Sequence, residues 1–280
     1  MMQNINWKEI AKKTVIYLIV GSGALLMLMP FLWMLSSSLQ TSHQVNLRPP
    51  VWFPNPPQWG NYNRILHYAP YFPRYFVNNI IVAGAGTLLE VTTSVLAAFA
   101  FSRLRFWGRN VVFYILLATM MIPGEIMLIP NFLTIVRLGW LDTYQALIIP
   151  WSASILSIFL LRQFFLGIPD SLSYAAKVDG CRNFRFLWAV MVPLARPALV
   201  TIALLSVISS WNAFLWPLIV TNSHSMRTLP LGLALFRGEA GTFFELLMAA
   251  SVVAVLPMVI LFVIMQKHIV ASVSRSGLKG

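Results

Sequence analysis

The side chains that could do ionic chemistry inside this chain are few. Two glutamates, Glu90 and Glu125, lie within long apolar runs. An ionisable residue in such a run is costly and marks a candidate proton or cation site. The alternative is a carboxylate that is paired or protonated among packed helices, and the sequence leaves both interpretations open.

Other chemistry finds little support in the sequence. The histidines (His43, His67, His224 and His268) are scattered, without the paired spacing of a zinc site. One cysteine, Cys181, allows no disulfide within the chain. Neither a Ser/His/Asp nor a Cys/His set stands out, and the G-x-x-x-x-G-K-[ST] phosphate loop does not occur. We therefore predict no catalytic residue, no metal site and no cofactor bound by this chain.

The composition indicates a membrane protein. Of the 280 residues, 58% are hydrophobic and only 10% are charged. A typical soluble domain has about 25% charged residues, which form a polar surface. This chain has too few charges for such a surface, so the elements that position its polar residues are expected to lie in a bilayer.

Apolar runs long enough to cross a bilayer as helices recur along the chain. They are Thr14–Ser38, Val77–Phe101, Val111–Pro130, Thr143–Leu161, Pro197–Val220 and Phe244–Met265. The first is too long for a cleaved signal peptide and is interpreted as a retained helix. The expected fold class is an all-α integral membrane protein with six transmembrane helices.

Basic residues predict the orientation, because cytoplasmic loops carry an excess of Lys and Arg. With six spans, 14 of the 20 basic residues fall on the side of both termini. These are Lys8, Lys12, Lys13, Arg103, Arg105, Arg109, Arg162, Lys177, Arg182, Arg185, Arg196, Lys267, Arg275 and Lys279. Both termini are therefore predicted to be cytoplasmic. This topology explains the net charge of +12, so nucleic-acid binding is not expected.

The segment Gln40–Phe76 holds 7 of the 17 prolines and is predicted to be an extended external connector. Its aromatic residues are of the types that favour the membrane interface. They are Trp52, Trp59, Tyr62, Tyr68 and Tyr71.

A charged insert, Ser171–Pro197, interrupts the apolar runs and is too polar to cross a bilayer. Asp170 or Ser171 is expected to cap a first helix, and Gly180 to end it in a left-handed conformation. A second short helix is expected to start at Asn183. Leu172, Ala175, Ala176 and Asp179 fall at i, i+3, i+4 and i+7, which places them on one helical face.

The insert is thus predicted to be a helix–turn–helix at the cytoplasmic surface. Two roles fit it equally at this point. It either rests on lipid headgroups as an amphipathic helix or provides a docking element.

Short motifs then relate the chain to a known family. A-A-x-x-D-G (Ala175–Gly180), followed after twelve residues by P-L-x-x-P (Pro193–Pro197), resembles the "EAA" coupling loop of ATP-binding-cassette (ABC) importer permeases. PFLWMLSSSL, FPNPPQWGNY, SSWNAFLWPL and RTLPLGL resemble further segments of the carbohydrate-uptake permeases, most closely the maltose-type second subunit. The chain departs at Tyr174, where the family has Glu, and at Ala213, where an acid often follows Trp-Asn.

This resemblance implies a type I ABC importer permease in the cytoplasmic membrane. Residues 1–76 would form an N-terminal helix and external segment, 77–267 the permease core with its coupling loop at 162–196, and 268–280 a cytoplasmic tail. The implied partners are a second permease subunit, ATPase subunits that bind ATP and Mg, an extracellular or periplasmic solute-binding protein, and membrane lipid. The implied ATPase-coupling residues are Tyr174, Ala175, Ala176, Asp179, Gly180, Pro193 and Pro197.

The resemblance also implies a sugar or oligosaccharide as the solute. The candidate substrate path is Ser206, Ser209, Ser210, Trp211, Asn212 and Trp216, which combine aromatic faces with hydrogen-bonding groups. The tryptophans would equally suit an interfacial belt, and the serines close helix packing. Two other functions stay open: import of another polar solute such as glycerol phosphate, and an ion-coupled carrier that uses Glu90 or Glu125.

Overall fold

The computed structural model describes residues 7–238 and 241–276, which are mostly helical. The chain packs as two compact units. One unit comprises Met1–Pro70 and Leu235–Val255, and the other comprises Tyr71–Ala234 and Leu256–Gly280. Each unit has its own internal packing and is described by itself.

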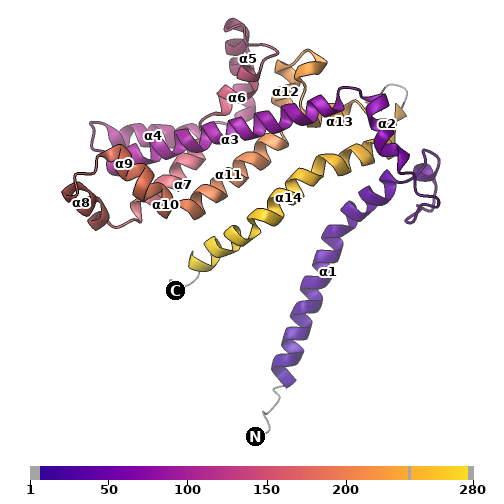
Figure 1. The fold of residues 1–280 in the computed structure, drawn as a ribbon, viewed down its shortest axis with the longest axis horizontal. Helices are drawn as coiled ribbons and strands as arrows, with labels where there is room; N and C mark the ends of the chain where they lie inside the picture. The colour runs from indigo at the N-terminus through magenta and orange to yellow at the C-terminus, as the bar shows by residue number, and fades with distance from the viewer. Residues whose placement is uncertain (1–6, 239–240, 277–280) are drawn as a thin grey trace. The chain divides into compact units, whose positions relative to one another are not determined.

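The first unit is dominated by α1 (Trp7–Ser38), a long apolar helix (Figure 1). Its large side chains between Val15 and Leu35 are mostly exposed within the unit. Shorter elements follow it: η1 (Gln44–Asn46), α2 (Gly60–Tyr68), the two-stranded hairpin β1 (Arg237–Gly238) with β2 (Gly241–Thr242), and the start of α14 (Phe244–Ser276). An apolar helix of this length with exposed side chains is long enough to cross a bilayer, where lipid or a partner helix would cover those side chains.

The proline-rich segment is more ordered than an extended connector, so that prediction is wrong in part. Asn61 of α2 donates from Nδ2 to the backbone oxygens of Ser38 (3.0 Å) and Gln40 (2.8 Å), which fastens α2 to the end of α1. Buried Glu245 accepts a hydrogen bond from Ser42 in the same unit. These side-chain bonds hold the start of the segment and α2 in place within this unit.

The second unit is organised around α3 (Phe72–Arg103), which packs along α7 (Ile155–Leu166) and α11 (Arg196–Trp211) (Figure 1). The remaining helices of this unit are α4 (Arg109–Thr119), η2 (Gly124–Met127), α5 (Leu128–Arg137), α6 (Tyr144–Ile148), η3 (Ile149–Trp151), α8 (Asp170–Val178), α9 (Asn183–Phe186), η4 (Leu187–Met191), α10 (Val192–Leu194), α12 (Leu215–Val220), η5 (His224–Met226) and α13 (Leu229–Ala234). The end of α14 also belongs to it.

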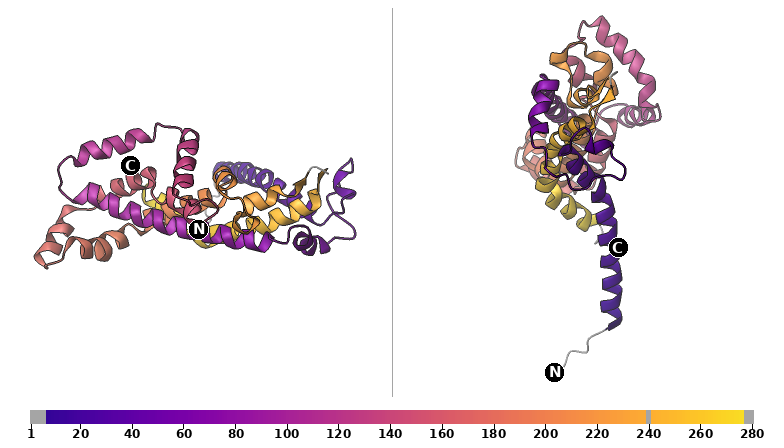
Figure 2. Two further views of the ribbon diagram at one scale, coloured as in Figure 1. Left: turned by 90° about the horizontal axis from the view of Figure 1, so that it is seen from above. Right: turned by 90° about the vertical axis from the view of Figure 1, so that its right-hand side faces the viewer.

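Three described helices are long and apolar enough to cross a membrane alone: Lys12–Ser38, Phe72–Arg103 and Phe244–Gln266. Three further pairs of helices pass the same test only when each bent pair is counted as one span. The predicted run Val111–Pro130 is one of the regions that the structure does not form as a single helix. It breaks between α4 and α5 with a 95° bend, which Figure 2 shows. The break coincides with Pro123, which disfavours a helical conformation at the preceding residue.

The predicted runs Thr143–Leu161 and Pro197–Val220 are also interrupted. Between α6 and α7 the bend is 42°. After α11, Asn212–Phe214 leave the helix before α12 resumes it. Pro217 contributes to this break, because it has no N–H to offer to the carbonyl of Ala213. Composition alone predicted where apolar chain lies, but it did not predict these bends.

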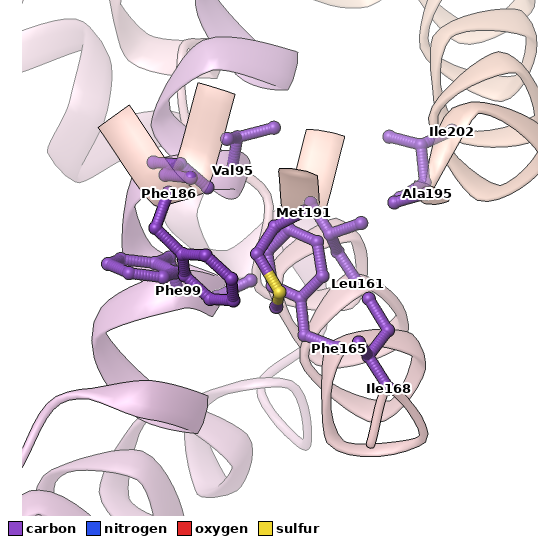
Figure 3. Packing of buried hydrophobic residues seen from close by; sticks show 11 residues of the cluster. Val95, Phe99, Leu161, Phe165, Ile168, Phe186, Met191, Ala195 and Ile202 are labelled. Carbon is purple, nitrogen blue, oxygen red and sulfur yellow. The ribbon is translucent and has the colours of Figure 1, made fainter. Parts of the chain in front are cut away.

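The main apolar cluster of the second unit joins α3, α7 and the segment α9–α11 (Figure 3). Phe165, Leu161, Met191 and Ala195 are completely buried in it. The Phe99 and Phe186 rings approach to 6.5 Å between centroids. Tight packing of this kind transmits displacement between helices, because the interior is dense and resists deformation.

Candidate functional site

The charged insert follows α7 and forms the helix α8, a turn, and a second helical segment made of α9, η4 and α10. Helix α8 begins at Asp170, with Pro169 in the N-cap position and no side-chain cap. The prediction that Asp170 or Ser171 caps the helix is therefore wrong. Asp170 instead lies in the first turn, where its negative charge suits the positive end of the helix dipole.

Gly180 ends α8 as predicted, with φ of +69°. The Cys181 amide donates to the Ala176 carbonyl (2.8 Å), and the Gly180 amide donates to the Lys177 carbonyl (3.0 Å). This pair of bonds is a Schellman motif, which requires a left-handed residue and favours glycine. The second helix, α9, starts at Asn183, also as predicted. The local chemistry of the turn thus sets the angle between the two helices.

Of the four residues predicted to share one face of α8, Leu172, Ala175 and Asp179 are exposed and only Ala176 is partly buried. Ala176 is half-buried and packs against the apolar cluster of Figure 3, so it faces the protein's own core. On the other side, Tyr174 is 62% exposed and Val178 is 87% exposed. Lys177 lies 6.0 Å from the centroid of the Tyr174 ring. The side of α8 open to a partner is therefore centred on Tyr174 and Val178, with Ala175 beside them, and not on Ala176.

Arg103, the last residue of α3, fixes the start of the insert. Its Nη2 donates to the backbone oxygens of Phe165 (2.6 Å) and Ile168, and its Nη1 pairs with the Asp170 carboxylate. The arginine side chain is only 10% exposed. One guanidinium therefore ties together the ends of α3 and α7 and the first turn of α8, using the planar fork geometry of arginine.

The insert returns to the apolar helices through a segment that contains Pro193 and Pro197. Pro197 lies in the first turn of α11, where a missing N–H leaves no helix bond unmade. Pro193 lies within the unbroken helical segment formed by α9, η4 and α10, directly after the π-helical turns of η4. The segments Asn183–Leu194 and Arg196–Trp211 meet at 81°. The residues predicted for coupling thus lie on α8, in the turn that follows it and in α10 and α11, and among them Ala176 faces inward.

A cavity of about 970 Å³ lies in the same unit, along α3, α7 and α11. Four of the predicted substrate-path residues on α11 and just after it line the cavity: Ser206, Ser209, Ser210 and Asn212. Ser154 and Ser157 of α7 face it as well. Much of the remaining lining is apolar, which is the usual make-up of a small-molecule site.

Glu90 is the centre of the polar network at this cavity. Ser157 Oγ donates to Glu90 Oε1 (2.7 Å), and Ser206 Oγ donates to Glu90 Oε2 (2.6 Å). The Thr87 hydroxyl lies 3.0 Å from Ser206 Oγ, and it must donate because Ser206 already gives its proton to Glu90. The carboxylate thus joins α3, α7 and α11, and is partnered within the bundle.

The two tryptophans predicted for the path are both buried, at 7% exposure for Trp211 and 5% for Trp216. Trp216 Nε1 donates to the Ala146 carbonyl (2.8 Å), and its ring meets Trp151 edge-on. Trp211 packs edge-on against Phe76 and does not line the cavity, whereas Trp216 does. Within this chain both rings are largely packed among other residues, and of the two only Trp216 borders the cavity.

Two residues at these sites escaped the sequence-based analysis. Ser157 was not singled out, although its position three residues after Ser154 in an apolar run was a usable signal. Arg103 was counted only as a basic residue that sets topology, because its contacts are with residues more than 60 positions away.

A polar turn outside the apolar helices joins the segment before α6 to the segment after α12. The amides of Asn222 (2.9 Å) and Ser223 (3.0 Å) donate to Asp142 Oδ1. Burial opposes ionisation of this carboxyl, but the hydrogen bonds outweigh it and lower the pKa of Asp142.

These features define a mostly helical, multi-pass membrane subunit with a helical insert at one end and, among its helices, a cavity that carries a few polar groups. The family model described as "Binding-protein-dependent transport system inner membrane component" matches residues 90–275. The chain belongs to this family of ABC-importer permease subunits, which act in transport and are components of the inner membrane.

Individual relatives agree with this assignment. The arabinooligosaccharides transport system permease protein AraQ of Bacillus subtilis is 34% identical over 260 residues, covering 92% of each chain. The trehalose/maltose transport system permease protein MalG of Thermococcus litoralis is 37% identical over 279 residues, covering 98% of this chain and 99% of MalG. A crystal structure of a bacterial ABC transporter involved in the import of the acidic polysaccharide alginate contains a chain with a TM-score of 0.83, 27% identity, and coverage of 95% and 99%.

Proposed function

We propose that this permease subunit carries a sugar or oligosaccharide into the cytoplasm by alternating access. The cavity carries this proposal. Its volume of about 970 Å³ is in the range of small-molecule sites, and hydroxyl and carboxylate groups line part of an otherwise apolar wall. The solutes in the printed names of AraQ, MalG and the alginate transporter support a saccharide.

The energy for transport comes, in this proposal, from separate ATPase subunits that bind ATP and Mg. They dock on the open side of the insert, at Tyr174, Ala175 and Val178. Asp179 and Gly180 shape the turn, and Pro193 and Pro197 lie in the helices that lead back to the cavity. Ala176 acts from the inside, by seating α8 on the apolar cluster. A helix pair seated in this way moves as one body with α7 and α11.

The proposed complex contains a second permease subunit and a solute-binding protein, as the family description "binding-protein-dependent" suggests. Residues 77–267 would form the permease core, 1–76 an additional helix with its external segment, and 268–280 a cytoplasmic tail. The chain would contribute six spans: three from single long helices, two from the bent helix pairs that begin at Arg109 and Tyr144, and one from α11 together with α12 after the insert.

Cysteine labelling tests the orientation of this arrangement. In a Cys181→Ser background, a membrane-impermeant maleimide should label His43→Cys from outside the cell and should not label Ser171→Cys. His43 is preferable to Ser42, whose hydroxyl bonds to Glu245. Labelling of Ser171→Cys from outside would reverse the topology and remove the insert from the ATPase.

The function itself is tested by reconstitution. The chain is co-expressed with a candidate second permease, ATPase and binding protein from the same organism, and the complex is placed in liposomes. Uptake of a neutral oligosaccharide should require ATP and the binding protein. Uptake that follows an imposed proton or sodium gradient while ATP is held constant would favour the ion-coupled carrier. If glycerol phosphate were the only solute taken up, the sugar assignment would fail but the permease role would stand.

A further inference from the structure

The charges that line the cavity are all of one sign. Among the described residues, its only ionisable lining groups are Glu90 and Glu125, and no lysine, arginine or histidine is among them. The other polar groups of the wall are serine hydroxyls and the Asn212 side chain. The net charge of +12 comes from basic residues outside this lining, so the acidic character of the wall is a local feature of the cavity.

Glu90 is held so that it can accept more hydrogen bonds. Each of its carboxylate oxygens already accepts one serine proton, from Ser157 or from Ser206. A carboxylate oxygen has two acceptor sites, so each oxygen retains one more. Because its two serine partners come from α7 and α11, the carboxylate has a fixed position in the wall.

Serines on α11 add groups that can both donate and accept. Ser206, Ser209 and Ser210 fall at i, i+3 and i+4, and all three line the cavity. A wall of hydroxyls and a carboxylate with spare acceptor sites matches the hydroxyl groups of an uncharged sugar. An anionic solute would instead meet two carboxylates in partly apolar surroundings, where like charges repel more strongly than in water.

We propose that Glu90, together with Glu125, makes this subunit selective for uncharged saccharides and against anionic ones such as uronate oligomers and sugar phosphates. This inference rests on the proposed function and specifies its solute. It separates this chain from the alginate importer whose fold it shares, since alginate is described as an acidic polysaccharide.

The test measures binding to the assembled transporter without its binding protein, which would otherwise impose its own selectivity. Saturation-transfer NMR on the complex in nanodiscs compares maltotriose with trigalacturonic acid, two trisaccharides that differ in charge. We expect maltotriose to bind at least about tenfold more tightly than trigalacturonic acid. The ratio of the two affinities should fall at least about fivefold in the double variant Glu90→Gln/Glu125→Gln.

Matched variants separate selectivity from folding. Glu125→Gln alone removes an exposed cavity charge without touching the Glu90 bonds, and it should narrow the ratio in part. Asp142→Asn removes one charge outside the cavity lining and should leave the ratio unchanged.

Equal binding of both trisaccharides to the wild-type complex, or a ratio that does not change in the double variant, would overturn the inference. If trigalacturonic acid were bound and taken up, saccharide import would survive while the selectivity would fail. If neither trisaccharide bound and the reconstituted system took up no saccharide, the proposed function would fall, and the selectivity with it.

Discussion

The insert and the cavity are both built on α3, α7 and α11, but different contacts hold them. At the insert, buried apolar side chains and one arginine fasten α8–α10 to the ends of the long helices. At the cavity, the same helices meet through a carboxylate and serine hydroxyls. Apolar packing resists deformation, whereas hydroxyl bonds exchange readily with those of water or a solute.

This difference fits the two tasks that the proposed function gives to these regions. An insert that receives force from an ATPase would have to move as one body, and dense packing provides that. A wall that meets the solute would have to release one set of hydrogen bonds and form another as the path changes. The comparison can be tested with variants that weaken the packing of the insert, and with variants that change residues on its inner or its outer side alone.

The largest effect on stability is expected in the apolar cluster that holds the insert. Phe165→Ala should lower the free energy of unfolding by about 3–5 kcal/mol, because it empties a fully buried site. Its matched control is Phe184→Ala, which truncates a side chain that is 68% exposed and should leave stability within about 0.5 kcal/mol. Thermal unfolding in detergent measures both, and equal losses would show that the insert has no distinct inner side.

A smaller effect is expected from the arginine that ties three helix ends together. Arg103→Gln should cost about 1.5–3 kcal/mol, the usual range for hydrogen bonds to a charged group. It should also uncouple the complex, so that ATP hydrolysis continues while uptake per ATP falls. Arg105→Gln removes the same charge from an exposed neighbour and should do neither. A normal ratio of uptake to hydrolysis in Arg103→Gln would remove Arg103 from the coupling path.

Tyr174 tests the outer side of the insert. Tyr174→Ala should weaken ATPase binding about tenfold, because an exposed aromatic at the centre of a docking side typically contributes 1–2 kcal/mol or more. Tyr174→Phe keeps the ring and should weaken ATPase binding only slightly. The ATPase recovered on co-purification gives the comparison. If Phe were as harmful as Ala, the hydroxyl rather than the ring would make the contact.

The smallest effect on stability is expected at the turn. Gly180→Val should cost about 1–2 kcal/mol, because φ is +69° and a side chain there is strained. An added Cβ would meet no atom within 4 Å, so the cost is conformational rather than steric. Gly180→Asn should be tolerated better, since Asn visits this region more readily than other residues. If the Gly180→Val and Gly180→Asn variants showed the same uptake per ATP hydrolysed, the angle of the turn would not matter for coupling.

The sequence predicted the insert better than it predicted the long helices. The left-handed Gly180 and the start of α9 at Asn183 follow from turn chemistry, which acts over a few residues. The apolar runs were located correctly as regions, but two of them are bent and a third is interrupted between α11 and α12. Apolar composition predicts which segments prefer lipid, but it does not predict a break near Pro123 or Pro217.

The sequence by itself determined the membrane class, the family and the local shape of the insert, because composition, motifs and turn residues act locally. Only the tertiary structure decided which side of α8 is open, that Arg103 holds the insert, and that Ser157 and Ser206 both bond to Glu90. Each of those features joins residues separated by many positions along the chain. Such pairs are set by how α3, α7 and α11 pack, and helical periodicity within one segment carries no information about its neighbour's register.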